Sequence, residues 1–163
     1  MLSLKIRQSR CKMYKILIVD DESIEREGIS FLIEKYKLPL EVAQATNGKT
    51  ALEYMRTHPI DILLTDVKMP QMDGLELARH TFEKYPDVRI LVFSAYGEFE
   101  FAKKAMAAQA VSYLLKPIEV DEFQRVMAQI LAQCDELAEK KKDEQQRGEE
   151  YRQRLLFRLV TGT

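Results

Sequence analysis

The sequence is poor in several residue types and patterns that particular classes of protein require. Its 163 residues include no tryptophan, 2 cysteines, 6 glycines and 5 prolines. No apolar run approaches the roughly 20 residues that a membrane-spanning helix requires, so we expect no membrane segment. Cys11 and Cys134 stand far apart and offer neither a disulfide framework nor paired metal-ligand spacing, which favours a reducing cytoplasm. An excess of one charge is also missing, since 25 basic side chains face 26 acidic ones, and a generally basic nucleic-acid binder is not indicated.

The composition fits one ordinary domain with an extension. Hydrophobic residues make up 46% of the sequence and charged residues 31%, a mixture that can bury a core and excludes a wholly disordered chain. Residues 1–12 carry four basic side chains and no acidic one, without the continuous apolar stretch of a signal peptide. We therefore interpret residues 1–13 as an N-terminal tail.

Short apolar runs, rich in branched and aromatic side chains, predict the strands. They cover residues 16–19, 60–65, 90–93 and 111–115, and a weaker run covers residues 40–43. Continuous rather than alternating hydrophobicity indicates burial on both faces, as in a parallel sheet. The weaker run is expected at an edge of that sheet.

Helical stripes alternate with these runs. The first stripe consists of Ile24, Gly28, Phe31 and Leu32. The later stripes are Gly48, Ala51, Leu52 and Met55; Leu75, Ala78 and Phe82 behind the N-cap residue Asp73; and Phe99, Ala102 and Met106. Five such alternations predict an α/β fold, with right-handed crossovers and helices on both faces of a five-stranded parallel sheet.

The last predicted helix carries a different pattern. From residue 120, apolar residues step by four and three positions, which is a heptad seam. The seam consists of Phe123, Met127, Ile130, Cys134 and Leu137. A charged stretch follows at 138–154, and one helix over residues 120–160 would be about 60 Å long. We predict a domain at 14–135 and a helical extension at 136–163, which pairs two chains as a parallel coiled coil.

Four of the predicted strands run directly into reactive polar residues. These residues are Asp20 and Asp21, Asp66, Ser94, and Lys116. Since ligands of an open parallel sheet bind outside the carboxyl ends of its strands, we expect these side chains to converge at one edge. Each residue alone has an ordinary explanation, such as a helix cap, an Asx-turn or a solvated loop. Their equivalent positions at the strand ends favour one shared site.

Three carboxylates, one ammonium group and one hydroxyl in a small space have a defined chemistry. The carboxylates raise each other's pKa unless a cation relieves the repulsion. Hard oxygen ligands that are open to solvent suit Mg²⁺. A Mg²⁺ ion beside a lysine neutralises the charge on a transferring phosphoryl group. The cluster thus indicates phosphoryl transfer to a carboxylate, which yields an acyl phosphate on the protein.

Four separated stretches resemble the receiver domain of two-component response regulators. They read ILIVDDE at 16–22, TDVKMPQMDGL at 65–75, FSAY at 93–96 and YLLKP at 113–117. They occur in the same order and at matching spacing. The resemblance covers residues 14 to about 135 and implies a flavodoxin-like (βα)5 fold with strand order 2-1-3-4-5.

The resemblance also implies a role for each matching residue. It makes Asp66 the phosphoacceptor and a metal ligand, and it places Mg²⁺ directly on Asp21 and, through water, on Asp20. The Lys68 backbone carbonyl becomes the third metal ligand, and Ser94 the switch hydroxyl. Tyr113 becomes the switch aromatic. Lys116 becomes the phosphate-pairing lysine, and it precedes a cis peptide bond to Pro117. Gln109 departs from the family, which often has glycine there, and this leaves the end of the fourth helix open.

The implied function is that of a signalling domain. It accepts a phosphoryl group from a sensor histidine kinase, catalyses only its own phosphorylation and dephosphorylation, and pairs as a homodimer when phosphorylated. The stretch SAYGEFEFAKKA at 94–105 and the long extension resemble transcription regulators with an AraC-type DNA-binding domain, so DNA contact is expected only through a domain outside this chain. Two alternatives stay open. One is a stand-alone receiver that acts by protein–protein interaction, and the other is a Mg²⁺-dependent phosphohydrolase, which usually has an aspartate where Lys68 stands.

Overall fold

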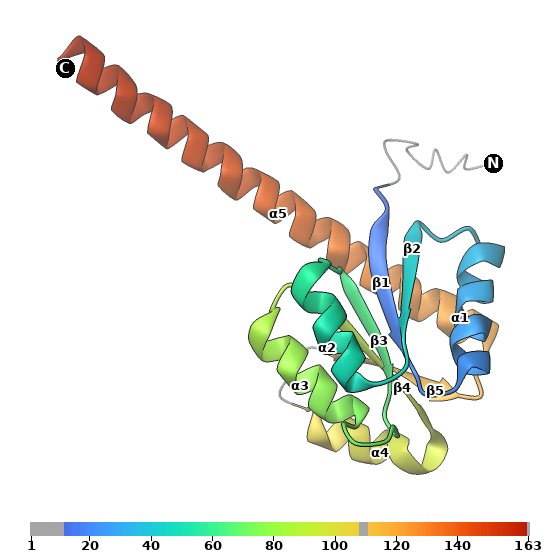
Figure 1. Cartoon of the computed structure of the whole chain (residues 1–163). Coiled ribbons are helices and arrows are strands. Elements are labelled where there is room, and N and C mark those ends of the chain that lie inside the picture. The colour runs from blue at the N-terminus through green and yellow to red at the C-terminus, as the bar shows by residue number, and fades with distance from the viewer. Residues whose placement is uncertain (1–11, 108–110, 163) are drawn as a thin grey trace, which may run out of the picture.

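A computed structural model describes residues 12–107 and 111–162. Its sheet contains five parallel strands in the order β2-β1-β3-β4-β5 (Figure 1). The strands are β1 (Tyr14–Val19), β2 (Leu40–Ala45), β3 (Ile62–Asp66), β4 (Arg89–Ala95) and β5 (Val111–Lys116). The predicted α/β fold and strand order are confirmed, and the weak run at 40–43 lies in the edge strand β2, as expected.

Five helices in the described residues cover the two faces of this sheet. They are α1 (Ser23–Lys35), α2 (Gly48–Thr57), α3 (Gly74–Lys84), α4 (Tyr96–Ala105) and α5 (Val120–Thr161). Helices α1 and α5 pack on one face, against strand residues such as Ile16 and Ile62. Helices α2, α3 and α4 cover the other face, against residues such as Leu17 and Val92. Because helices cover both faces, every residue of β3 is buried, which explains its apolar run.

Side-chain caps determine where two of the helices begin. Asn47 accepts a hydrogen bond from the backbone N–H of Thr50 at 2.8 Å, and its own backbone N–H donates to the Thr50 hydroxyl, so the pair forms a capping box at the start of α2. Asp73 accepts from the backbone N–H of Glu76 at 2.8 Å. The predicted N-cap at Asp73 is confirmed, and α3 begins close behind the end of β3.

The predicted stripe of α1 is only partly confirmed, since Leu32 packs against the core but Ile24 and Phe31 do not. Ile24 is 73% exposed and Phe31 is 61% exposed, whereas Ile29 and Ile33 are buried. The helix carries apolar residues on more than one side, so periodicity alone permits more than one stripe, and the sheet buries the Ile29–Ile33 pair. Phe82, which we assigned to the core stripe of α3, also lies at the surface. The chain thus has more apolar side chains on α1 than its own core uses.

The first half of α5 is a core helix rather than a dimer seam. Four of the five predicted seam residues are buried against the sheet, namely Phe123, Met127, Ile130 and Cys134. Polar contacts add to this packing, since the Tyr14 hydroxyl donates to Asp135 Oδ1 at 2.5 Å and Lys141 Nζ lies 2.8 Å from Asp87 Oδ2. The coiled-coil seam predicted at 123–137 is therefore wrong. Two heptads also describe one face of an amphipathic helix, and here that face packs on the protein's own sheet.

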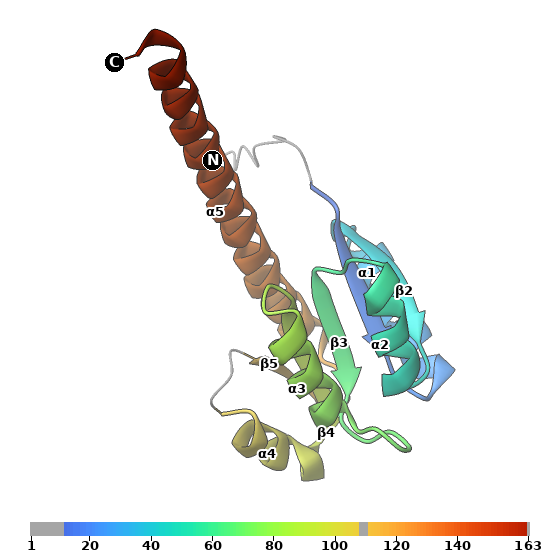
Figure 2. The same cartoon turned by 60° about the vertical axis from the view of Figure 1, so that its left-hand side comes forward.

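Beyond the sheet, α5 continues without interruption. Its 42 residues correspond to about 63 Å. All residues from 139 to 162 are exposed, and Figure 2 shows this part projecting away from the body of the molecule. Gly148 lies inside the helix and does not break it. A glycine destabilises a helix by only about 1 kcal/mol relative to alanine, which is too little to end it.

Two expectations from the sequence lie outside the described residues. They concern the N-terminal tail up to residue 11 and the helix exit at Gln109. Helix α4 itself ends at Ala105, with Met106 as its C-cap. In the parts of the chain that are described, no helix combines the length and the apolar character needed to cross a bilayer.

Candidate functional site

The carboxyl ends of four strands bring the predicted polar residues together. Asp20 follows β1 directly, and Asp66 is the last residue of β3. Ser94 lies one residue before the end of β4, and Lys116 ends β5. Because these strands are parallel, Asp20 and Lys116 meet at this edge although 96 positions separate them in the sequence. The expected convergence therefore occurs.

The ammonium group of Lys116 lies between two carboxylates. Its Nζ is 3.4 Å from Asp20 Oδ2 and 3.5 Å from Asp66 Oδ1. It also lies 4.2 Å from the ring centroid of Phe93, within reach of a cation–π interaction. Burial by itself lowers the pKa of Lys116, but the carboxylates of Asp66 and Asp20 outweigh it, and the net shift is upward. Lys116 thus holds a permanent positive charge beside Asp66.

Backbone contacts orient Asp20. The residue is fully buried, and its Oδ1 accepts a hydrogen bond from the backbone N–H of Glu22 at 2.9 Å. The Asp20 carbonyl accepts from Arg26 Nη1 at 2.6 Å, which ties the end of β1 to α1. Its Oδ2 is left facing Lys116. Asp21, the next residue, is exposed, so the acidic pair contributes one buried and one solvent-accessible carboxylate.

Asp66 is a buried carboxylate with a perturbed pKa. Its Oδ1 accepts a hydrogen bond from the backbone N–H of Val67 at 2.8 Å. Burial is the largest influence and raises the pKa of Asp66 to about 6, while Lys116 lowers it and Asp20 raises it. A bound cation would favour the ionised form, because opposite charge offsets the loss of solvation.

Ser94 lies at this edge of the sheet, and Tyr113 connects β5 with α4. The Ser94 hydroxyl is buried and has no hydrogen-bond partner among the described residues. Such an unsatisfied hydroxyl costs roughly 1–3 kcal/mol, so it suits a site where a ligand supplies the missing acceptor. Tyr113 is half-buried in β5, donates a hydrogen bond from its hydroxyl to the Ala102 carbonyl at 3.4 Å, and meets the Phe99 ring edge-on.

The acidic residues fit a divalent cation. Asp20, Asp21 and Asp66 offer carboxylate oxygens that all lie within 4.8 Å of one another. A set of hard oxygen donors with one side open to solvent is what Mg²⁺ takes in proteins. Lys68, whose carbonyl is the further predicted ligand, lies two residues after Asp66, and its exposed side chain reaches Glu98 Oε1 at 3.9 Å. The role of that carbonyl stays a prediction.

Our sequence-based predictions did not include Gly74, which the structure places against the site. A Cβ atom added at Gly74 would lie 1.8 Å from the backbone oxygen of Asp66, so only glycine allows α3 to begin this close to β3. The backbone N–H of Gly74 donates to the Val67 carbonyl at 2.8 Å. The Asp73-Gly74 pair is a visible turn signal, but the sequence does not say which backbone it approaches. The contact between Phe93 and Lys116 had no comparable signal.

Comparisons with known proteins relate the chain to one family. The chain matches the response regulator receiver domain family over residues 16–128. It is 41% identical over 122 residues to the uncharacterized transcriptional regulatory protein YesN of Bacillus subtilis, which covers 74% of this chain and 33% of that protein. It is 31% identical over 118 residues to the transcriptional regulatory protein DegU of Brevibacillus brevis, with 71% and 50% covered. The chain thus spans a third to a half of the length of these relatives.

Solved structures share the fold. A two component transcriptional regulator AraC from Clostridium phytofermentans superposes with a TM-score of 0.70 at 35% identity, covering 76% of this chain and 96% of that one. The REC domain of AraT, a response regulator from Geobacillus stearothermophilus, superposes with a TM-score of 0.67 at 38% identity, covering 79% and 98%. With the fold, the clustered acidic residues and these matches in agreement, the chain belongs to the family of receiver domains of two-component response regulators.

Proposed function

We propose that this domain accepts a phosphoryl group on Asp66 from a phosphohistidine of a sensor kinase. The observation that carries the proposal is the arrangement at one sheet edge, where Lys116 lies 3.5 Å from Asp66 and the Ser94 hydroxyl lacks a partner among the described residues. A permanent cation and a free donor beside a carboxylate suit a group that brings several negatively charged oxygens.

The transfer exchanges one phosphorus bond for another. A carboxylate oxygen of Asp66 attacks the phosphorus, the bond from phosphorus to the imidazole nitrogen breaks, and the histidine leaves with the electron pair. Lys116 Nζ meets the charge on the phosphoryl oxygens. Attack of water on the acyl phosphate later releases inorganic phosphate and restores Asp66. In this proposal the domain therefore catalyses only its own phosphorylation and dephosphorylation.

Asp20, Asp21 and Asp66 would hold the divalent cation, and the family resemblance adds the Lys68 carbonyl. When bound, Mg²⁺ supplies positive charge against the phosphoryl oxygens and between the carboxylates. The hydrogen bond from the Glu22 N–H and the contact with Lys116 keep Asp20 in position for this task.

Ser94 and Tyr113 would pass the event on to α4. The Ser94 hydroxyl donates to a phosphoryl oxygen and so gains the acceptor that it lacks. The family resemblance lets the Tyr113 ring turn inward in response. Its hydrogen bond to the Ala102 carbonyl is long, at 3.4 Å, and its loss removes a link between β5 and α4. The exposed surface of α4 then changes.

The kinase would dock beside Lys116, on α1. Ile24 and Phe31, which the core leaves on the surface, project from this helix. Phe31 lines a hollow together with Lys116 and Ile118, and Gly28 leaves it open because no heavy atom lies within 4 Å of its added Cβ position. An exposed apolar patch next to a reactive group marks an interaction site. A helix that carries the phosphohistidine fits such a patch.

The output that we propose is control of transcription, through a DNA-binding domain outside this chain and a homodimer formed on phosphorylation. The names of the YesN and DegU relatives, and the AraC regulator among the solved structures, support this output. The same proposal places the receiver at 14–135 and the extension at 136–163, and α5 keeps one contact with the body beyond that boundary, between Lys141 and Asp87. A cytoplasmic location belongs to the same proposal.

Phosphorylation can be tested directly on the chain. Incubation with acetyl phosphate and Mg²⁺ should add the mass of one phosphoryl group, which hydroxylamine removes. The variant Asp66→Asn should gain no such mass, whereas the control Asp143→Asn, on the exposed part of α5, should be labelled like the parent. Hydroxylamine-sensitive label that persists on Asp66→Asn would refute the assignment.

A further inference from the structure

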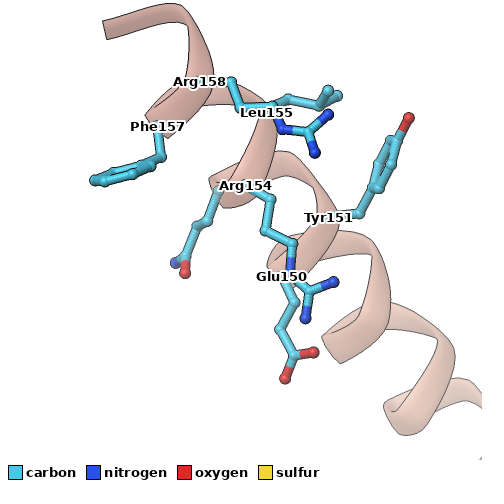
Figure 3. Close-up of a pocket in the computed structure, with 7 residues that line it drawn as sticks. Glu150, Tyr151, Arg154, Leu155, Phe157 and Arg158 are labelled. Carbon is cyan, nitrogen blue, oxygen red and sulfur yellow. The ribbon is translucent and has the colours of Figure 1, made fainter. Parts of the chain in front are cut away.

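The distal segment of α5, residues 151–160, is an apolar helix that lies free of the receiver body. Its apolar side chains are Tyr151, Leu155, Leu156, Phe157, Leu159 and Val160, and they are between 42% and 85% exposed. Figure 3 shows Tyr151 and Phe157 projecting from different sides of the helix. Six exposed apolar residues within ten positions are typical of an interaction site rather than of a free surface.

The spacing of these residues does not fit a single two-helix seam. A coiled coil places its apolar residues at two of the seven heptad positions. The six apolar residues of the distal segment fall on six different heptad positions, and the seventh is held by Arg154. At 100° per residue the six apolar side chains spread over roughly two thirds of the helix circumference, with Arg154 and Arg158 in the remaining part, so they must be enclosed on several sides to be buried. The same distribution argues against a helix lying on a membrane surface, which has one apolar face.

The charges of the segment restrict its partner further. Arg152, Arg154 and Arg158 lie between residues 151 and 160, and no acidic residue does. Two copies of the segment side by side would bring six arginines together without a carboxylate of their own. A partner surface would suit both the apolar side chains and the arginines if it formed an apolar groove with carboxylates along its rim. We call such a groove an apolar cradle.

We infer that the distal segment is a core helix of the domain that follows this chain in the longer protein, where it sits in an apolar cradle with carboxylates facing Arg154 and Arg158. The inference rests on the proposed function only in placing an output domain after residue 163. The length of the relatives supports that occupant, since the matched region makes up 33% of YesN and 50% of DegU. Helix α5 would then be fixed at both ends, by the receiver sheet and by the output domain.

Hydrogen exchange measured by mass spectrometry tests this occupant. In the 163-residue chain, amides of the distal segment should exchange fast, because a helix end without packing is marginally stable. In the protein extended by the residues encoded after Thr163, the same amides should exchange at least about 10-fold more slowly. Equal exchange in the two proteins, or a stop codon directly after Thr163, would overturn the inference.

Variants separate the cradle from other occupants. Arg154→Glu should abolish the added protection, whereas Arg147→Glu, which lies on the same side of the helix but before the apolar residues, should retain it. Self-association of the 163-residue chain that Leu159→Asp abolishes would assign the segment to a second copy instead. Binding to vesicles that contain phosphatidylglycerol, but not to neutral ones, would assign it to a membrane.

The outcome is independent of phosphoryl transfer. Exchange is measured without a phosphoryl donor, and the label on Asp66 is measured separately by intact mass. Slower exchange in the distal segment without phosphorylation of Asp66 would support the apolar cradle and refute only the phosphoacceptor role. Phosphorylation of Asp66 without slower exchange would refute only the cradle.

Discussion

Asp66 combines two demands that oppose each other. Burial raises its pKa to about 6, yet the phosphoacceptor role that we propose for it requires an ionised oxygen. Lys116 partly offsets this cost at 3.5 Å, and a divalent cation between Asp20, Asp21 and Asp66 would offset more of it. At the scale of the residue, the site is therefore set up to bind positive charge before it reacts.

The first prediction concerns the stability of Asp66→Asn. Because the pKa of Asp66 is raised above its unfolded value, the folded state holds the extra proton between about pH 4 and 6, and its stability falls as the pH rises through 6. Asparagine stays neutral at both pH values. Without Mg²⁺, the free energy of unfolding of the variant should therefore exceed that of the parent by up to about 3 kcal/mol at pH 8, and the two should be equal near pH 4. Urea unfolding at both pH values measures this difference.

Mg²⁺ provides the control for that measurement. It should stabilise the parent more than Asp66→Asn at pH 8, since a ligand stabilises the state that binds it. A difference between the two proteins that is independent of pH would contradict the raised pKa.

The second prediction concerns Lys116→Ala. Loss of the ammonium group should leave Mg²⁺ binding intact but uncouple the phosphoryl group from the rest of the domain, because we propose that the phosphoryl group pairs with Lys116. Addition of beryllofluoride should shift the NMR signals of Tyr113 in the parent and in the exposed control Lys49→Ala, and far less in Lys116→Ala. A parent-like shift in Lys116→Ala would show that the signal takes another route.

At the scale of the element, helix packing determines the shape of the site. Helix α3 begins so close to β3 that Gly74 touches the backbone of Asp66. Helix α5 packs Phe123, Met127 and Ile130 on the opposite face of the sheet. The first contact positions the reactive residue, and the second keeps α5 attached to the strands that carry it.

The third prediction tests the contact at Gly74. Gly74→Ala places a methyl group 1.8 Å from the Asp66 backbone oxygen, so backbone must shift, at a cost of about 1–3 kcal/mol or more. Phosphorylation by acetyl phosphate should slow as Asp66 moves. Gly28→Ala in α1 is the matched control, because nothing lies within 4 Å of the added atom, and it should stabilise by roughly 0.5–1 kcal/mol. Equal stability of the two variants would rule out the close approach.

The fourth prediction distinguishes a core helix from a dimer seam in α5. Ile130 is buried in the monomer, so Ile130→Ala should lower the free energy of unfolding by about 2–5 kcal/mol. The exposed neighbour variant Gln129→Ala should change it by less than about 0.5 kcal/mol. A dimer that dissociates in Ile130→Ala while the monomer keeps its stability would restore the seam.

At the scale of the whole molecule, the homodimer that we propose would use surfaces other than the face of α5 that packs on the sheet. Phe101 of α4 is exposed and lies on the helix that Tyr113 contacts through Ala102. An apolar side chain on this helix is suited to the interface that we propose to form on phosphorylation.

The fifth prediction is that beryllofluoride drives dimerisation through this surface. Sedimentation should detect a dimer of the parent with beryllofluoride and Mg²⁺, and Phe101→Asp should weaken it at least about 10-fold. Ile24→Asp, on α1, should dimerise like the parent. If both variants pair equally well, α4 is not the interface.

The sequence by itself determined the features that depend on local patterns. Unbroken apolar runs predicted the strands because covered sheets bury both sides of each strand. The Asp73 cap marked the start of α3, and the polar residues at the strand ends predicted the cluster of charged side chains at one edge of the sheet. The resemblance of four short motifs supplied the strand order, which the sheet confirms.

Only the tertiary structure decided between patterns that are locally equivalent. Apolar residues on two sides of α1 satisfy the same period, and contact with the sheet selected Ile29 and Ile33. The seam of α5 reads equally as a coiled coil or as a core face until a sheet lies against it. Gly74 beside Asp66 and Phe93 beside Lys116 join separate elements. Burial and contact between distant residues arise from three-dimensional packing, and a local pattern of residues does not encode which surface it will meet.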